Sequence, residues 1–302
     1  MTTEIILRER PDPLGSGRPL TPPLDLSVTT QGPLYPPSEV MDAQGNFIVI
    51  GAVNEDGPDG VTTRWGGAVV SPRTNVPQFG QRAPYTIVER FDPEAPLPDA
   101  IATKVLYTLP VPLPCNNYTM LFAPQQYPDA RSETRPSYAF HEVPIPDARP
   151  EHGRQLTGPV TLADWVRARG SVRLFDVNDG CDVLFRCDFS GLLPRSLYTV
   201  MTLRARDLDP AGPTRPGPLG IPNAFVTDGT GGARFEAVLP DPFPDPAQPD
   251  GNRVINLVVL WMSSQLCHGG AIGRYGLGGD IHAQLKFPQP MFEGLRTRSQ
   301  FA

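Results

Sequence analysis

The sequence has 302 residues, of which 39% are hydrophobic, so it can bury one large core or two ordinary ones, and disorder throughout is excluded. Its formal net charge of -6 gives no basic surface for capturing nucleic acid or anionic lipid, and we expect neither partner. The 38 prolines and 29 glycines favour short strands joined by loops, because proline is excluded from helix interiors and central strands.

Residues 1–40 are rich in proline and lack a sustained apolar period, which predicts an extended arm. Docking onto a neighbouring subunit is one way to order such an arm. The first residues, 1–7, are interrupted by Glu4 and followed by charged residues, so the apolar core of a secretory signal is missing. We therefore expect a soluble protein that is cytoplasmic by default or exported by a route not visible in the sequence.

Residues 41–122 form a first β region. β-rich runs separated by turn-forming residues predict its strands, and the segment 54–60 is expected to be a loop. The expected strands are 47–53, 61–70, 85–91, 101–109 and 118–122.

A proline-rich connector is predicted at 123–159, and one short helix follows it. Thr161 and Asp164 have the spacing of a capping box, 162–169 contains good helix formers, and Gly170 stands where a helix would stop. Such a short helix must pack against something, and Trp165 is the expected anchor.

The C-terminal region, 160–302, is predicted to be a β-sandwich domain. Seven strand candidates with turn residues between them give a mainly β chain with a Greek-key-like antiparallel β-sandwich. The apolar run 254–262 is expected to be its central strand and is too short to span a bilayer, which needs about 20 residues. The candidates are 171–177, 181–189, 197–206, 224–228, 232–239, 253–262 and 280–287.

Two features of these strands bear on chemistry. Alternation in the last strand puts Asp280 and His282 on its polar side, which we expect to face solvent. Cys181 and Cys187 share an alternating strand and are expected to be buried thiols; a disulfide from either one to Cys115 or Cys267 would need an oxidising compartment and stays open.

The C-terminal region resembles bacterial β-sandwich domains of the chordin-type and copper-zinc superoxide dismutase-like group. The resemblance covers roughly 160–287 and rests on the Gly-Leu-Leu-Pro turn at 191–194, the strand at 198–200 and the ending 278–285. It implies a sandwich fold. It does not imply dismutase activity, because the His-x-His copper motif is missing: the histidines are His141, His152, His268 and His282.

The sharpest candidate site combines His268, Asp280 and His282 around the glycine-rich segment 269–279. If the flanking strands pair, the loop could bring the three together, and imidazole with carboxylate suits a divalent transition metal. The competing interpretation is that Asp280 and His282 are ordinary polar residues on a strand. Cys267 lies beside the same segment.

A second candidate is a binding surface. Arg274 and Tyr275 stand in the glycine-rich loop, and Trp65 lies next to a Gly-Gly pair, so an exposed aromatic could stack on a sugar. Core or cross-strand packing is the competing interpretation for an aromatic residue in a strand.

No recognised catalytic motif occurs in the sequence. We therefore expect a non-enzymatic structural or binding β-sandwich protein without a cofactor, which self-associates as a homo-oligomer or docks a protein partner through its proline-rich segments. The alternatives are a metal-dependent enzyme using His268, Asp280 and His282, and a carbohydrate-binding module with a glycan ligand.

Overall fold

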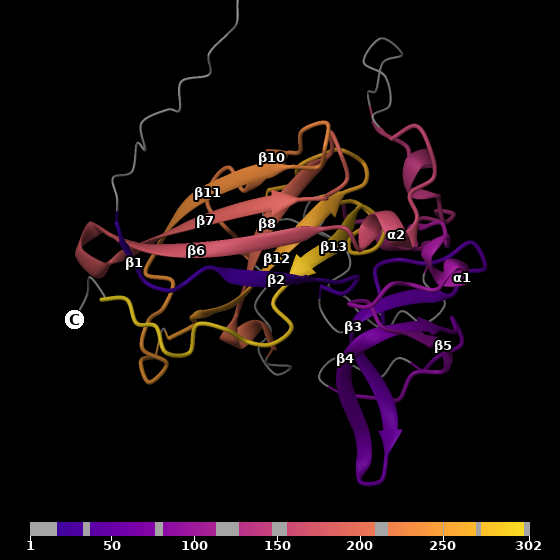
Figure 1. Ribbon diagram of the computed structural model, residues 1–302, viewed down its shortest axis with the longest axis horizontal. Helices are drawn as coiled ribbons and strands as arrows, with labels where there is room; N and C mark the ends of the chain where they lie inside the picture. The colour runs from indigo at the N-terminus through magenta and orange to yellow at the C-terminus, as the bar shows by residue number, and fades with distance from the viewer. Residues whose placement is uncertain are drawn as a thin grey trace, which may run out of the picture.

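The computed structural model describes residues 17–32, 37–75, 81–112, 127–146, 156–208, 217–249, 251–269 and 273–298. The fold is mainly β, and the sandwich-like antiparallel architecture predicted from the sequence is confirmed (Figure 1). The chain forms one large sheet and one small sheet.

The large sheet curls into the two layers of the sandwich. Its order is β10-β8-β12-β13-β2-β6-β7-β11, while β1 adds to β6 and β9 adds to β8. All its strand pairs are antiparallel within the described residues. The strands are β1 (Arg18–Pro19), β2 (Leu24–Val28), β6 (Arg169–Val177), β7 (Asp182–Ser190), β8 (Leu197–Arg204), β9 (Gly217–Pro218), β10 (Ala224–Val226), β11 (Ala233–Pro240), β12 (Val254–Met262) and β13 (Ile281–Lys286).

β2 joins the two layers, because it pairs with β13 on one side and with β6 on the other. Residues 24–28, which the sequence placed in an extended arm, are therefore a strand in the middle of the sheet, and Leu26 is buried in the core. Residues 1–16, where docking onto a neighbouring subunit stays a prediction, lie outside the described residues.

The small sheet contains β3 (Phe47–Gly57), β4 (Gly60–Val70) and β5 (Ile87–Phe91). The predicted loop at 54–60 is wrong: β3 and β4 continue to Gly57 and Gly60, so Pro58 and Asp59 alone make the turn. The hairpin projects from the body of the molecule (Figure 1). The strand predicted at 101–109 is also wrong, since α1 (Asp99–Ala102) covers its first residues and the rest makes only isolated bridges at Val105 and Tyr107. Residues 118–122 lie outside the described residues.

The predicted capping box is confirmed in α2 (Leu162–Trp165), where Thr161 and Asp164 exchange side-chain and backbone hydrogen bonds. The helix is one turn long and shorter than predicted, because β6 already begins at Arg169. Trp165 is the anchor, fully buried with its Nε1–H donating to the carbonyl oxygen of Thr29 at 2.9 Å. The remaining short elements are 3-10 helices: η2 (Ala130–Ser132), η3 (Phe140–Glu142), η5 (Asn178–Gly180) and η6 (Ala205–Leu208).

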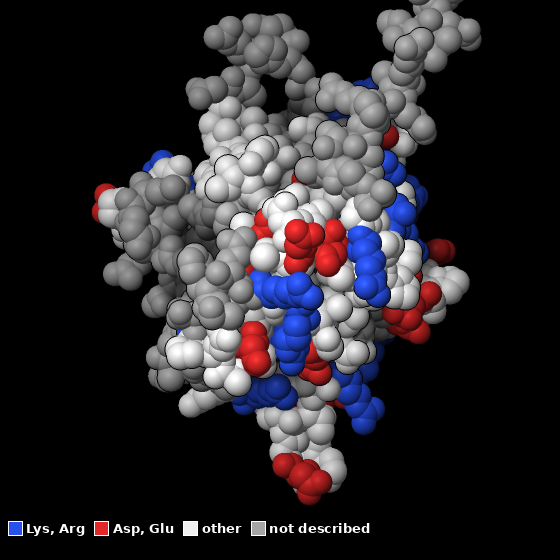
Figure 2. Space-filling model, turned by 90° about the vertical axis from the view of Figure 1, so that its left-hand side faces the viewer, with Lys and Arg blue, Asp and Glu red and all other residues white. Residues whose placement is uncertain are grey.

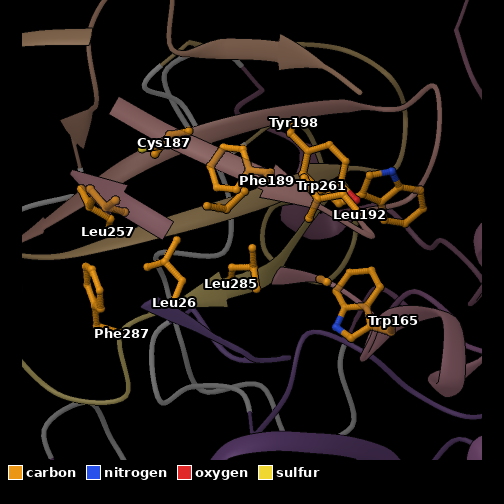
Figure 3. Packing of buried hydrophobic residues seen from close by; sticks show 14 of the residues in the cluster. Leu26, Trp165, Cys187, Phe189, Leu192, Tyr198, Leu257, Trp261, Leu285 and Phe287 are labelled. Carbon is orange, nitrogen blue, oxygen red and sulfur yellow. The ribbon is translucent and has the colours of Figure 1, made fainter. Parts of the chain in front are cut away.

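The main core lies between the sandwich layers and continues under the small sheet. Figure 3 shows Leu26, Leu257 and Leu285 approaching one another from β2, β12 and β13. Ile48 of the small sheet belongs to the same cluster, so the predicted first β region and the C-terminal sandwich share one core. Phe140 of the predicted connector is also fully buried in it.

The cysteines within the described residues are free thiols: Cys187 is buried as predicted, Cys181 is half-buried, and Cys267 is exposed. Burial raises the pKa of the Cys187 thiol, which keeps it protonated and unreactive. Cys115 lies outside the described residues.

Figure 2 shows acidic and basic side chains interspersed on one face, with acidic side chains at the tip of the projecting hairpin, which contains Glu55, Asp56 and Asp59. Among the described helices, none has the length and apolar character needed to cross a membrane.

Candidate functional site

Two of the three predicted metal ligands, His268 and Asp280, lie together beside the glycine-rich loop. Asp280 is 4% exposed, and its Oδ2 accepts a 2.6 Å hydrogen bond from the backbone N–H of Tyr275. A side chain on Gly273 would begin 3.0 Å from both Asp280 Oδ2 and His268 Nε2. Burial raises the pKa of Asp280, although the Tyr275 N–H and the charges of Arg135 and His268 act in the opposite direction.

The third predicted ligand, His282, sits in the main core. Its ring lies between Phe140 and Trp261, with ring centres 4.8 and 5.4 Å away, and it is 0% exposed. Its Nδ1 is 2.9 Å from the carbonyl oxygen of Glu39, which can only accept, so the proton is on Nδ1. Burial lowers the pKa of His282 to about 3, and the imidazole is neutral at neutral pH.

The expectation that Asp280 and His282 face solvent is wrong. His282 and Gln284 point into the main core, where Gln284 accepts from the Tyr198 hydroxyl at 2.7 Å and donates to the Trp165 carbonyl at 3.1 Å. A β-bulge at Gln284 breaks the alternation of β13, so Leu285 faces the main core as well. Ile281 and Ala283, on the opposite side of the strand, face a second apolar cluster. Both sides of β13 are covered, which strand alternation alone does not reveal.

The metal site stays a prediction. Across the described part of the chain, no three His, Cys, Asp or Glu side chains are grouped so that they could hold a metal ion. His268 and Asp280 would be the two protein ligands available at one point, and the Nε2 of His268 is buried without a hydrogen-bond partner among those residues.

The structure also shows a buried charged pair that sequence reasoning missed. Glu39 accepts the backbone N–H of Gly32 at 2.9 Å and that of Ala283 at 2.5 Å through its two carboxylate oxygens. Lys286 donates to the carbonyl oxygen of Gly32 at 3.0 Å. Both side chains are buried, and together they fasten the chain before β3 to β13.

Burial shifts both of these groups toward neutrality. It raises the pKa of Glu39 to about 7 and lowers the pKa of Lys286 to about 8, since each charged form loses hydration inside the protein. The attraction between the two charges acts against both shifts. Strongly shifted pKa values occur both at catalytic sites and at buried structural ion pairs. Solvent access distinguishes the two kinds of site, because a catalytic group must reach a substrate.

The predicted binding residues of the glycine-rich loop are engaged with the chain itself. Arg274 forms an ion pair with Glu133, and the Tyr275 hydroxyl donates to the same carboxylate at 3.0 Å. The guanidinium of Arg135 lies 4.6 Å from the centre of the Tyr275 ring, and its Nη1 donates to the carbonyl oxygen of Gly279 at 3.1 Å. The loop is thus held against the segment 127–140.

Trp65, the predicted sugar-stacking residue, is half-buried on β4. The ammonium of Lys286 lies 5.6 Å from the centre of its ring, a cation–π contact that stabilises the buried lysine. One side of the indole is therefore occupied by the protein itself. The carbohydrate site stays a prediction.

The sequence contains the alternation that places Lys286 on β13, but no local signal marks Glu39. Its partner Ala283 is 244 residues away, so their pairing follows from the tertiary fold alone. Sequence reasoning also missed Arg135, which is buried. It lies in the predicted proline-rich connector, where a charged residue is expected to be exposed to solvent.

Comparisons with protein-family models, with curated proteins and with solved structures found no match. The resemblance of the C-terminal region to chordin-type and superoxide dismutase-like sandwiches therefore stays a prediction.

Proposed function

We propose that this chain is a non-enzymatic structural or binding protein that acts by self-association or by docking a protein partner at its proline-rich segments. The observation that carries the proposal is the closure of the β13 site. Asp280 and His282 are buried, and their hydrogen bonds go to backbone groups of Tyr275 and Glu39. Side chains enclosed in this way stabilise the fold and do not meet a substrate.

A proline-rich segment provides a surface on which a partner can dock. A groove of about 560 Å³ lies between the segment that joins β1 to β2 and the outer side of β6. Its proline residues have little conformational entropy to lose on binding, which favours association. The groove is lined by Pro19, Leu20, Thr21, Pro22, Pro23, Arg173 and Phe175.

The groove combines apolar and charged character. The guanidinium of Arg186 lies 5.0 Å from the centre of the Phe175 ring, and Arg173 forms a 2.9 Å ion pair with Asp188. These contacts hold Phe175 and Arg173 in place without filling the groove. An extended aliphatic or proline-rich segment of another chain fits such a surface, since prolines pack well against aromatic rings.

Sedimentation of the purified full-length chain over a range of concentrations, together with metal analysis, tests this function. We expect association that strengthens with concentration and no stoichiometric metal. A strict monomer that contains stoichiometric zinc, copper or iron, lost in His268→Ala, would overturn the proposal.

A metal-dependent enzyme is the second candidate, and one observation favours it. The unpartnered Nε2 of His268 and the Oδ2 of Asp280 approach the same point beside Gly273. Calorimetric titration with zinc separates the candidates: tight binding to the wild type that disappears in both His268→Ala and Asp280→Asn supports the enzyme, and heats equal to the buffer blank exclude it.

A further inference from the structure

The groove between the β1–β2 segment and β6 has a different chemical character on each side (Figure 1). The β1–β2 segment contributes an apolar side, made mostly of leucine and proline side chains. β6 contributes Arg173 and Phe175 from its outer face, because the alternate residues Val172 and Leu174 are buried in the main core. A ligand for this groove therefore needs an apolar part and a group that binds a guanidinium.

The apolar side lacks most of the backbone donors that a foreign strand would need. Three of its five residues, Pro19, Pro22 and Pro23, have no backbone N–H. The N–H of Leu20 already donates to the carbonyl oxygen of Leu174 at 2.9 Å. A partner therefore binds here by side-chain packing, which is how a polyproline II segment docks, since its conformation does not depend on pairing with a sheet.

Phe175 supplies an aromatic surface whose position is fixed. The guanidinium of Arg186 lies 5.0 Å from the centre of its ring. Pro19 is the direct cross-strand partner of Phe175, so a proline already stands beside this ring on the same face. The ring is half-buried, and its exposed part can take a further proline from a partner.

Arg173 has hydrogen-bond donors that the described part of the fold does not use. Its Nη2 donates to the Oδ2 of Asp188 at 2.9 Å, whereas its Nε and Nη1 make no hydrogen bond with the described residues. The side chain is 40% exposed. A guanidinium carries five N–H donors in a planar fork that matches the two oxygens of a carboxylate, so a second carboxylate can bind the unused edge.

The local charge also favours a carboxylate. Arg234 donates to the other oxygen of Asp188 at 2.7 Å, so one carboxylate serves two guanidiniums. Two positive charges and one negative charge leave this group of three with a net positive charge, although the whole chain has a net charge of -6. An acidic partner complements this edge of the groove, and a basic partner is repelled by it.

We propose that the groove binds an extended proline-rich segment of a partner protein, which packs a proline against Phe175 and places a carboxylate on Arg173. This inference rests on the partner docking in the proposed function and names the class of partner. Extended segments of this kind have little conformational entropy to lose on binding.

A foreign protein suits the groove better than a second copy of this chain. Two exposed proline–aspartate segments of the chain are folded into turns and are not extended. Pro58 and Asp59 make the turn between β3 and β4. In the segment 245–249, the N–H of Gln248 donates to the carbonyl oxygen of Asp245 at 3.0 Å, which closes a turn.

Fluorescence anisotropy with the full-length chain tests the proposal. The probes are two labelled peptides of six prolines, one with a central aspartate and one with a central asparagine. We expect saturable binding of both, with the aspartate peptide bound about twofold to fivefold more tightly, as for an exposed charge pair. Arg173→Gln should remove this preference. Arg90→Gln is the matched control, an exposed arginine paired with Glu55 on the small sheet, and should keep it.

Phe175→Ala should weaken the binding of both peptides and leave the ratio of their affinities unchanged. Asp188 keeps Arg234 as its partner in Arg173→Gln, and a melting curve equal to that of the wild type establishes that this variant folds. Absence of binding at millimolar peptide, equal affinity for the two peptides, or a preference that persists in Arg173→Gln would each overturn the proposal.

Sedimentation of the same protein separates failure of this inference from failure of the proposed function. Self-association that persists while neither peptide binds overturns the groove ligand and leaves the proposed function standing. Self-association that the aspartate peptide abolishes assigns the groove to a second copy and overturns the foreign partner. A strict monomer that binds neither peptide overturns both.

Discussion

Glu39 and Lys286 hold the two backbone groups of Gly32 between them: the carboxylate accepts its N–H at 2.9 Å, and the ammonium donates to its carbonyl oxygen at 3.0 Å. The second carboxylate oxygen reaches Ala283 on β13. Burying a charge that has no hydrogen-bond partner costs several kcal/mol. In this pair, backbone groups serve as the hydrogen-bond partners of both charges. The pair therefore joins the chain before β3 to the sandwich, and its protonation is coupled to stability.

The pH dependence of stability should contain two opposing contributions. The pKa of Glu39 is raised to about 7 in the folded chain. As the pH rises from about 4.5 to 7, the unfolded chain therefore loses this proton while the folded chain keeps it, and the free energy of unfolding falls. The pKa of His282 is lowered to about 3 in the folded chain. Between about pH 3 and 6.5 the unfolded chain binds the additional proton, so the contribution of His282 to the free energy of unfolding rises with pH. Between pH 4.5 and 6.5 the two oppose each other.

Glu39→Gln should expose the histidine contribution. We expect the free energy of unfolding of this variant to rise by up to about 1.4 kcal/mol per pH unit between pH 4.5 and 6.5, more steeply than in the wild type. Urea unfolding at several pH values measures this. Glu89→Gln, which changes an exposed carboxylate on β5, is the control and should follow the wild-type curve. Equal slopes for Glu39→Gln and the wild type would contradict the prediction.

Lys286 should act at alkaline pH. Its pKa is lowered to about 8 in the folded chain, so between about pH 8 and 10.5 the unfolded chain binds the additional proton and the free energy of unfolding rises with pH. Lys286→Met should abolish this rise. Lys104→Met is the comparison, because Lys104 is the other lysine and pairs with Asp42 at 3.1 Å. A rise that persists in Lys286→Met would show that other groups cause it.

Gly32→Ala should loosen the buried pair. A side chain at this position would begin 2.6 Å from Glu39 Oε1, so the carboxylate must move and its hydrogen bonds weaken. We expect a loss of about 1–3 kcal/mol in the free energy of unfolding. Gly66→Ala on β4 is the control, since its side chain would meet nothing within 4 Å. Similar losses in both variants would mean that backbone flexibility, and not the carboxylate contact, is responsible.

Local patterns predicted β6, β7, β8, β10, β11, β12 and β13, because each depends on alternation and turn residues within a few positions, whereas β1, β2 and β9 were missed in proline-rich sequence. The capping box of Thr161 and Asp164 was visible for the same reason. The orientation of β13 was not, because the residues that cover its polar side, Glu39 and Phe140, come from segments whose proline content suggested an arm and a connector. The proximity of His268 and Asp280 was predicted from the loop between them. The burial of His282 was not predicted, because it packs against aromatic residues that are distant in sequence.

Gln31→Met should open the edge of β3. The carboxamide of Gln31 bonds both backbone groups of Ala52 and also donates to the carbonyl oxygen of Pro37 at 2.6 Å. Methionine has a similar volume and cannot make these bonds, so we expect a cost of about 1–3 kcal/mol and faster hydrogen exchange at the Ala52 amide. Gln44→Met, at an exposed position, serves as the control. Unchanged exchange at Ala52 would show that the carboxamide does not protect this edge.

Truncation from the N-terminus should reveal where the proline-rich region becomes part of the fold. Deleting residues 1–28 removes β1 and β2, which leaves backbone groups of β6 and β13 unpaired and takes Leu26 from the core, so we expect no cooperative thermal unfolding. Deleting 1–16 keeps every described strand and should leave the melting transition within a few degrees of the wild type. If the longer deletion still melts cooperatively, the sandwich closes without β2, and the arm predicted from the sequence would be dispensable for folding after all.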